Sequence, residues 1–179
     1  CSCRASICGS CSMRVNGSAK LVCKTRIKEM SPNGESISIE PMGNFPVIKD
    51  LVSDMDSFWS KMRSVDPYVK TSFTPEAEHI ASNESMTHLL GVMNCIMCGA
   101  CVSECTALEV DSSFTGPAAL AKAYRFVADP RDEEKSERLG KLNQQSGVWD
   151  CTRCLACVEV CPKDVAPMER IVKMRDFAI

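Results

Sequence analysis

Twelve of the thirteen cysteines in this chain fall into three groups whose spacing is typical of iron–sulfur ligands. Thiolates are soft ligands, which select iron–sulfur clusters, copper(I) or zinc. The first group follows the pattern C-x4-C-x2-C-x11-C, which is the plant-type spacing of a [2Fe-2S] cluster. Its members are Cys3, Cys8, Cys11 and Cys23. Cys1 is the cysteine left outside the three groups.

The other two groups repeat one run, C-x2-C-x2-C-x3-C, which is the ligand pattern of bacterial ferredoxins. Pro162 follows the last cysteine of the second copy, as proline does in that motif. Two complete copies in one chain predict two further clusters. The first copy consists of Cys95, Cys98, Cys101 and Cys105, and the second consists of Cys151, Cys154, Cys157 and Cys161.

The two runs are expected to exchange their last cysteines. In two-cluster ferredoxins the fourth cysteine of each run ligates the other cluster. We therefore expect Cys161 to join the first three cysteines of the earlier run. By the same rule, Cys105 is expected to join Cys151 and Cys157.

Zinc is the alternative occupant of four-cysteine sites. Zinc sites favour C-x2–4-C pairs, whereas Cys23 stands alone beyond a predicted hairpin. Gly9 lies inside the first loop, where glycine allows the backbone to come close to cluster sulfurs. Hydrogen bonds from that backbone, together with burial, set the reduction potential of a cluster. The spacing favours clusters, and two zinc ribbons are the alternative for the repeated runs.

Composition limits the class of partner and the compartment. With 179 residues and 45% apolar side chains, the chain is long enough for two small domains. Its net charge of −2 argues against nucleic acid as a partner. No run approaches the roughly 18 apolar residues that a membrane-spanning helix needs. Cluster ligands are reduced cysteines, which we expect most naturally in a cytoplasm.

Residues 1–45 are predicted to be the C-terminal part of a [2Fe-2S] domain. Asn16-Gly17 lies between short alternating runs and is a strong signal for a two-residue hairpin. Residues 36–40 alternate as a half-buried strand does, and Pro41 closes them. A lone hairpin is marginal in water. We therefore expect the natural protein to continue upstream with further strands, where any export signal would also lie.

Residues 46–179 are predicted to form a mostly helical domain that holds the two further clusters. Apolar residues recur at helical spacing over 48–62. That helix should end before Asp66-Pro67, because the residue preceding proline avoids the helical region. Residues 70–83 are predicted to be a loop.

The second half of the chain carries two more helical patterns. Gly116-Pro117 predicts a helix start, and Asp129-Pro130 predicts its end. Apolar residues over 168–177 indicate an amphipathic helix near the end of the chain. The charged run 129–138 is interpreted as a solvated turn and helix face.

Six segments around and between the cysteines carry a more specific pattern than the cysteines alone. Through them the whole chain resembles the iron–sulfur subunits of the succinate dehydrogenase and fumarate reductase family. The segments are C-R-A-S-I-C-G-S-C at 3–11, P-V-I-K-D-L-V-S-D-M at 46–55, V-D-P-Y at 65–68, C-I-M-C-G-A-C at 95–101, G-P-A-A-L-A-K-A-Y-R-F at 116–126 and C-V-E-V-C-P-K at 157–163.

The resemblance implies an α+β fold, with a partial β-grasp [2Fe-2S] ferredoxin domain followed by an α-helical two-cluster domain like that of bacterial ferredoxins. It implies a FAD-containing flavoprotein partner that interconverts succinate and fumarate, and a membrane-anchor or heterodisulfide-reductase-like partner. This chain would pass electrons between the two, and so indirectly to a quinone or thiol acceptor, without substrate chemistry of its own. The expected location is a peripheral membrane complex on the cytoplasmic side, with export alongside a partner as the alternative.

Cys154 departs from the pattern of that family. Most members hold a [3Fe-4S] cluster with three cysteines, which match Cys105, Cys151 and Cys157, and have another residue in place of Cys154. A fourth thiolate in this position favours a second [4Fe-4S] cluster in the third site. The alternative is a [3Fe-4S] cluster with Cys154 packed beside it as a small buried residue.

The acceptor side of the chain departs from the family as well. Many members have a tryptophan shortly after the cysteine that matches Cys105, and a histidine directly after the one that matches Cys151. This chain has no tryptophan there, and Thr152 replaces the histidine. Thr106 stands where proline is common. The alternative function is therefore an iron–sulfur adapter that serves a different flavoprotein or a heterodisulfide-type reductase.

Overall fold

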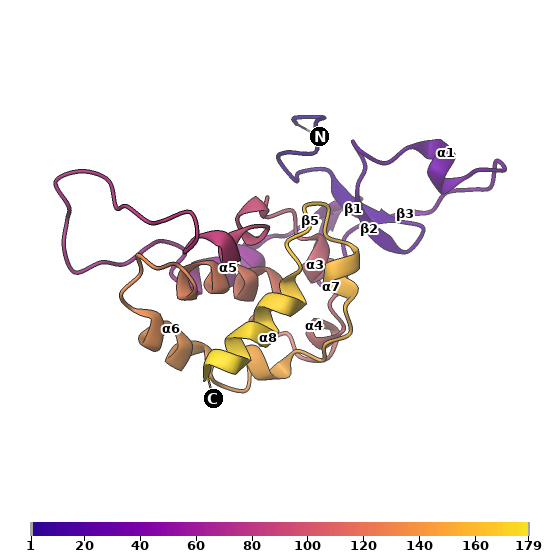
Figure 1. The fold of residues 1–179 in the computed structure, drawn as a ribbon. Helices are drawn as coiled ribbons and strands as arrows, with labels where there is room; N and C mark the ends of the chain where they lie inside the picture. The colour runs from indigo at the N-terminus through magenta and orange to yellow at the C-terminus, as the bar shows by residue number, and fades with distance from the viewer. Residues whose placement is uncertain (1, 179) are drawn as a thin grey trace.

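The structure is a computed structural model that describes residues 2–178, and its architecture is α+β, as the sequence predicts (Figure 1). A small sheet formed by the N-terminal part of the chain lies at one end of the molecule, and helices make up most of the remainder. The strands are β1 (Ser12–Val15), β2 (Ser18–Leu21), β3 (Ile39–Glu40), β4 (Val47–Lys49) and β5 (Val52–Ser53).

The helices are short, and most lie beyond residue 99. They are α1 (Ile27–Met30), α2 (Asp56–Ser64), α3 (Ala100–Ser103), α4 (Thr106–Val110), α5 (Pro117–Val127), α6 (Lys135–Leu142), α7 (Ala156–Glu159) and α8 (Pro167–Ala178), with 3-10 turns η1 (Thr87–Leu89), η2 (Val92–Asn94) and η3 (Val148–Asp150). None of the helices in residues 2–178 has the length and apolar character needed to span a bilayer.

The predicted hairpin is present as β1 and β2, which pair antiparallel from Ser12↔Leu21 to Val15↔Ser18. Asn16 and Gly17 form the turn with φ values of 50° and 77°, the left-handed conformation that favours these residue types. The predicted strand over 36–40 is shorter than expected, because only Ile39–Glu40 pairs with β1, on the side opposite β2.

The helix predicted over 48–62 is wrong in its first half. Residues 47–53 form the hairpin β4–β5 instead, and α2 begins only at Asp56. Asp50 takes a φ of 51° at the turn, which a helix cannot accommodate. Ile48 and Val52 are 68% and 58% exposed, so the first members of the apparent apolar stripe face solvent. The second half is confirmed, because Phe58 is buried and α2 ends at Ser64 as predicted.

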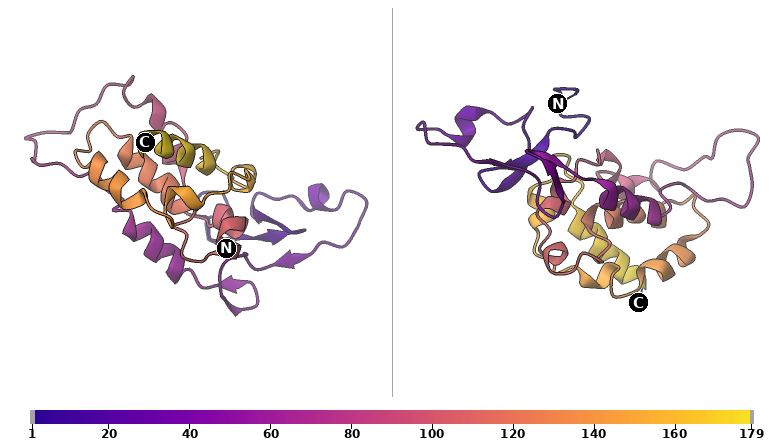
Figure 2. Two further views of the ribbon diagram at one scale, coloured as in Figure 1. Left: turned by 90° about the horizontal axis from the view of Figure 1, so that it is seen from below. Right: turned by 180° about the vertical axis from the view of Figure 1, so that it is seen from behind.

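Helix α5 is the centre of the helical part, and it is buried along most of its length. It packs mainly against α8 and also against α2, α3 and α6 (Figure 2). Pro117 occupies the first turn, and Gly116 precedes it with a φ of 87°, a value that favours glycine. Tyr124 from α5 and Met174 from α8 are among the most fully buried side chains. The predictions of α5 and α8 are therefore confirmed.

The charged run 129–138 is solvated over much of its length, as the sequence predicts, but Asp129 and Arg138 at its two ends are buried. Arg138 is 4% exposed and donates to the carboxylate of Asp132 at 2.9 and 3.1 Å. It also donates to the carbonyl oxygens of Val65, Asp66 and Tyr68 at 2.6–3.1 Å. These carbonyls follow the end of α2, where backbone acceptors have no partner within the helix. Arg138 is buried because its N–H groups bond to the backbone of the segment after α2.

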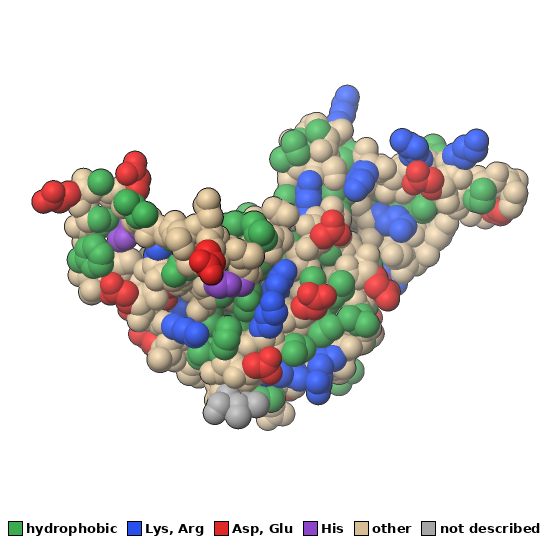
Figure 3. Space-filling view, viewed as in Figure 1, with side chains coloured by type: hydrophobic (Ala, Val, Ile, Leu, Met, Phe, Trp, Pro, Cys, Tyr) green, Lys and Arg blue, Asp and Glu red, His purple; other side chains and the backbone are tan. Residues whose placement is uncertain are grey.

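Basic side chains gather over the sheet end of the molecule (Figure 3). Lys24, Arg26 and Lys28 are exposed there. Arg14 instead reaches the helical part, where its Nε lies 3.3 Å from the carboxylate of Glu104. The sheet is therefore joined to the end of α3 by an ion pair.

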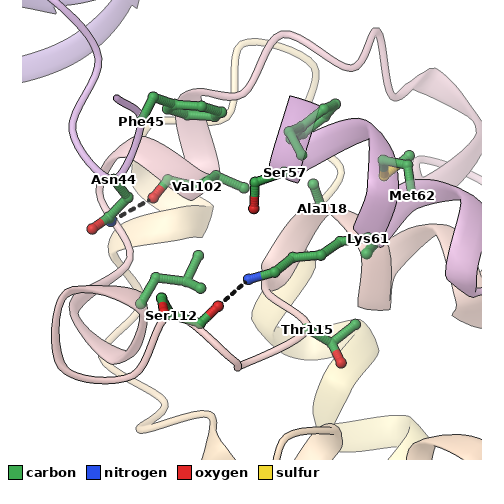
Figure 4. Close-up of a pocket in the computed structure, with 12 residues that line it drawn as sticks. Asn44, Phe45, Ser57, Lys61, Met62, Val102, Ser112, Thr115 and Ala118 are labelled. Carbon is green, nitrogen blue, oxygen red and sulfur yellow. Dashed lines mark hydrogen bonds between the residues drawn. The ribbon is translucent and has the colours of Figure 1, made fainter. Parts of the chain in front are cut away.

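The segment between the two parts is bonded to the helical part. Asn44 Nδ2 donates to the carbonyl oxygens of Val102 and Cys105 at 2.8 and 3.0 Å (Figure 4). The N–H of Gly43 donates to Ser103 Oγ at 2.9 Å, and a Cβ on Gly43 would lie 2.7 Å from the carbonyl oxygen of Ser103. Residues 43–44 are thus in close contact with the helical part, while the domain boundary after residue 45 stays a prediction.

Lys61 and Asn44 are among the residues that line a small pocket (Figure 4). Lys61 Nζ donates to the carbonyl oxygens of Ser112 and Phe114 at 2.7 and 2.6 Å. Burial lowers the pKa of Lys61, and the nearby Asp111 carboxylate acts in the opposite direction. The side chain fastens α2 to the loop that precedes α5.

Replacing Arg138 with methionine should destabilise the folded, cluster-loaded protein by about 3–5 kcal/mol, because Asp132 would keep a buried charge without a partner. Thermal and denaturant unfolding followed by circular dichroism measure the change. Lys141→Met is the matched control. The Lys141 side chain is half exposed and pairs with Asp66 and Glu137, so this substitution should lower the free energy of unfolding by less than about 1 kcal/mol. Equal losses in the two variants would contradict the structural role of Arg138.

Candidate metal centres

The first cysteine loop folds back so that its backbone donors converge on one sulfur. Two non-glycine residues of loop 3–11 have positive φ values of 54° and 57°, so the loop coils instead of extending. The N–H groups of Ala5, Ile7 and Cys8 donate to Cys3 Sγ at 3.4, 3.4 and 3.3 Å. Such bonds stabilise negative charge on a sulfur. The loop is built to hold a thiolate.

The other cysteines of this group surround the same loop. Cys8 Sγ lies 3.1 Å from Ser10 Oγ, and the hydrogen bond with Ser10 is the main cause that lowers the pKa of Cys8 to about 6. Cys23 lies beside Cys11, and the hydrogen bond between these thiols raises the pKa of Cys23. The structure thus brings Cys23 back to the loop from beyond β2. Cys1 lies outside the described residues.

The second site lies where the two repeated runs meet. Three cysteines of the earlier run and Cys161 of the later run line one cavity, together with residues of α5 and Pro162. The cysteines of the earlier run are Cys95, Cys98 and Cys101. The N–H of Val165 donates to Cys161 Sγ at 3.4 Å.

The third site has the reciprocal composition. Cys105 of the earlier run shares a cavity with three cysteines of the later run, Cys151, Cys154 and Cys157. Phe114 and Ile171 complete its apolar wall. The structure therefore places the fourth cysteine of each run with the first three of the other.

Burial and crowding make several of these thiols weak acids. Burial is the largest cause that raises the pKa of Cys157 to about 12 and that of Cys101 well above its usual range. Neighbouring thiols raise both further. Cys154 behaves differently: burial would raise its pKa, but hydrogen bonds from the N–H of Ala156 and from two threonine hydroxyls lower it.

The donor sets fit iron–sulfur clusters. All cysteines from Cys3 to Cys161 are free thiols. Thiols that resist ionisation when close together release their protons when a cationic centre binds. Within residues 2–178 no three His, Cys, Asp or Glu side chains are grouped to hold a single metal ion. In the second and third sites, four cysteines surround a shared space.

The first and second sites touch at Gly9. This residue has a φ of 74°, and a Cβ there would lie 2.8 Å from Cys98 Cβ and 2.9 Å from Cys98 Cα. Only a residue without a side chain fits this contact. The glycine of the first loop is therefore required by the second loop as well, which the sequence alone did not predict.

Arg175 positions the third site, and sequence reasoning missed it. This buried side chain on α8 donates to the carbonyl oxygens of Val148, Trp149 and Cys151 at 2.8, 3.1 and 2.8 Å. It thereby fixes the backbone that leads into the later cysteine run. A single arginine in an amphipathic helix gives no signal of this role in the sequence.

Comparison with known proteins supports both kinds of site. Residues 1–60 match the family described as a 2Fe-2S iron-sulfur cluster binding domain, and residues 91–165 match the 4Fe-4S dicluster domain. The fumarate reductase iron-sulfur subunit of Escherichia coli O6:H1 is 38% identical over 185 residues, which cover 99% of this chain and 75% of that protein. The chain belongs to the family of iron–sulfur subunits of fumarate reductase and succinate dehydrogenase.

Further members of the family agree with this assignment. The succinate dehydrogenase iron-sulfur subunit of Coxiella burnetii is 35% identical over 97% of this chain and 74% of its own length. In the solved Mycobacterium smegmatis Sdh1 complex in the apo form, one chain superposes with a TM-score of 0.89 at 25% identity, covering 98% of this chain and 74% of that chain. The predicted fold class and the electron-transfer role within an oxidoreductase of this family are confirmed.

Replacing Gly9 with alanine should weaken cluster retention in both the first and the second site, because the new methyl group collides with Cys98. Gly17→Ala is the matched control, since Gly17 has a similar φ of 77° but a methyl group there would meet nothing within 4 Å. The control should cost only the backbone strain of about 1–2 kcal/mol. Iron and acid-labile sulfide content, with electron paramagnetic resonance of each cluster, measures the effect. Equal cluster content in the two variants would show that the contact with Cys98 is unimportant.

Proposed function

We propose that the described cysteines hold three clusters in the crossed arrangement. A [2Fe-2S] cluster is held by Cys3, Cys8, Cys11 and Cys23, a [4Fe-4S] cluster by Cys95, Cys98, Cys101 and Cys161, and the third cluster by Cys105, Cys151, Cys154 and Cys157. The observation that carries this proposal is that each of two cavities is lined by cysteines of both repeated runs. Iron–sulfur clusters supply one-electron transfer when bound.

The third cluster is proposed to be a second [4Fe-4S] cluster. Cys154 lines the same cavity as the other three cysteines of this site. Its thiol receives hydrogen bonds that favour the thiolate, which is the form that binds metal. A cysteine that merely packs as a small apolar residue has no need of such donors. The [3Fe-4S] state is the alternative.

The arrangement of exposed and covered sites supports a role between two partners. Cys3 and Cys8 of the first site and Cys154 of the third site are exposed, whereas no cysteine of the second site is. The other cysteines of the third site are buried or partly exposed. Gly9 joins the first site to the second, and α3 packs against α7 between the second and the third. We thus infer three adjacent sites, of which the first and the third each present at least one exposed cysteine.

The partners follow from this arrangement and from the family. We propose that a FAD-containing subunit that interconverts succinate and fumarate contacts the exposed first site. A membrane-anchor or heterodisulfide-reductase-like subunit would contact the third site at the exposed Cys154 and serve a quinone or thiol acceptor. The complex would be peripheral to a membrane on its cytoplasmic side. Thr152, in place of the histidine common in the family, favours an acceptor partner other than the usual quinone-binding one.

The proposed function predicts the behaviour of Cys161→Ala in the intact complex. The variant should lose the cluster of the earlier run, more than fifty residues upstream by the numbering, while the cluster of Cys151 and Cys157 persists. Electron transfer from a reduced viologen dye at the acceptor end to fumarate should fall at least about tenfold. Electron paramagnetic resonance and dye oxidation measure the two effects.

Two results would contradict parts of this proposal. Loss confined to the cluster of Cys151 and Cys157 would show that the runs are not crossed. Co-purification of the wild-type chain with a flavoprotein that does not turn over succinate or fumarate would favour the adapter function. Ser85→Ala, in a loop apart from the cysteine sites, is the control for expression and assembly.

The four-iron assignment predicts that Cys154→Ala changes the type of the third cluster without removing it. Three thiolates remain in that site, which suffice for a three-iron cluster. Anaerobically prepared wild-type complex should show a four-iron spectrum for this site, and the variant should show a three-iron spectrum. A three-iron spectrum in fresh wild-type protein would refute the assignment.

A further inference from the structure

The second and third sites are built from two copies of one loop. In each loop, the residues directly before and after the second cysteine have positive φ values. A short helix, which carries the third cysteine, begins at the next residue. In the second site these are Met97 (54°) and Gly99 (80°) before α3, and in the third site they are Arg153 (58°) and Leu155 (69°) before α7. Cys154 therefore occupies the position that Cys98 occupies in the second site.

The two copies share their backbone donor. A backbone N–H two residues later, from Ala100 and from Ala156, hydrogen-bonds to Cys98 and to Cys154 respectively. This backbone donor therefore does not distinguish the two sulfurs.

Two side chains distinguish the third site from the second. Ile96 follows the first cysteine of the second site, and Pro162 follows its crossing cysteine. Both line the second cavity, and neither side chain can donate a hydrogen bond. The equivalent residues of the third site are Thr152 and Thr106, and each carries a hydroxyl.

The hydroxyl of Thr106 is aimed at the sulfur of Cys154. Thr106 Oγ1 donates to Cys154 Sγ at 3.6 Å, within the range for a bond to sulfur. Thr152 Oγ1 lies 3.5 Å from Thr106 Oγ1. Because Thr106 is the first residue of α4 and directly follows Cys105, its hydroxyl is held by the same backbone that supplies a cysteine of the site.

We propose that Thr106, supported by Thr152, donates a hydrogen bond to the Cys154 sulfur and thereby raises the reduction potential of the third cluster. This inference rests on the proposed function, in which Cys154 is a ligand. A reduced cluster carries one more negative charge, so a donor to its ligand sulfur stabilises the reduced state more than the oxidised state. The second site lacks these two donors. Thr106 is thus a positioning residue that favours the reduced state of the third cluster, which we propose faces the acceptor.

The test is the midpoint potential of each cluster in the intact complex, measured by redox titration followed by electron paramagnetic resonance. Thr106→Val keeps the shape of the side chain and removes the hydroxyl. It should lower the reduced-to-oxidised ratio of the third cluster at fixed potential by about tenfold, which corresponds to about 59 mV for a one-electron couple. Thr106→Ser should keep the wild-type potential, and Thr152→Val should cause a smaller shift in the same direction.

Controls separate this effect from general damage. The second cluster should keep its potential in Thr106→Val. Thr71→Val removes a hydroxyl that bonds to the carbonyl oxygen of Phe73, far along the chain from either run, and should shift no cluster. The converse variant, Pro162→Thr, introduces a hydroxyl at the position of the second site that is equivalent to Thr106 and should raise the potential of that cluster.

Failure of this inference differs from failure of the proposed function. An unchanged third potential in Thr106→Val, with the wild-type four-iron spectrum, overturns the role of Thr106 and leaves the ligand assignment intact. A three-iron spectrum in fresh wild-type protein overturns both. If Thr106→Val does not assemble its third cluster, Pro162→Thr decides, because an unchanged potential of the second cluster would show that a hydroxyl at this position has no effect.

Discussion

The structure depends on holding four thiols around each shared space although ionised thiols repel one another. Burial and neighbouring thiols raise the pKa of Cys101 and Cys157, so both side chains favour the protonated form until a metal centre binds. Metal binding releases those protons, and its free energy then contributes to folding. Helix α5 and the loops before α3 and α7 line the cavities at which the cysteines of distant runs meet.

Much of that positioning is done by buried polar side chains that bond to irregular backbone. Loops that wrap a cluster cannot form regular hydrogen bonds, so their carbonyl groups need other donors. Arg175 supplies donors to the segment before and at Cys151, and Asn44 supplies one to Cys105. Each residue satisfies two or more carbonyls, so its loss would leave several buried acceptors unpaired.

The sequence predicted correctly the turns and helix starts that depend on one or two adjacent residues. Asn16-Gly17 predicts its hairpin because few other residues adopt that turn, and Gly116-Pro117 predicts the start of α5. The cysteine spacing likewise indicated which residues meet at each site.

The helix expected over 48–62 was wrong at its start. A short apolar pattern fits an exposed hairpin and a helix equally well, and only the turn at Asp50 distinguishes the two. Arg138 and Arg175 were missed because their partners are backbone carbonyls, which have no sequence signature.

The contacts of Asn44 with Val102 and Cys105, together with those of Gly9 and Arg14, hold the first site against the helical part. Some electron carriers swing a domain on a flexible hinge to bring redox centres together. Here the connecting segment is bonded to the helical part through the N–H of Gly43 and the side chain of Asn44. The first cysteine loop packs directly against the second, where Gly9 meets Cys98. The separation between neighbouring centres is therefore set by packing, and electrons can tunnel along the chain at fixed distances without any swinging step.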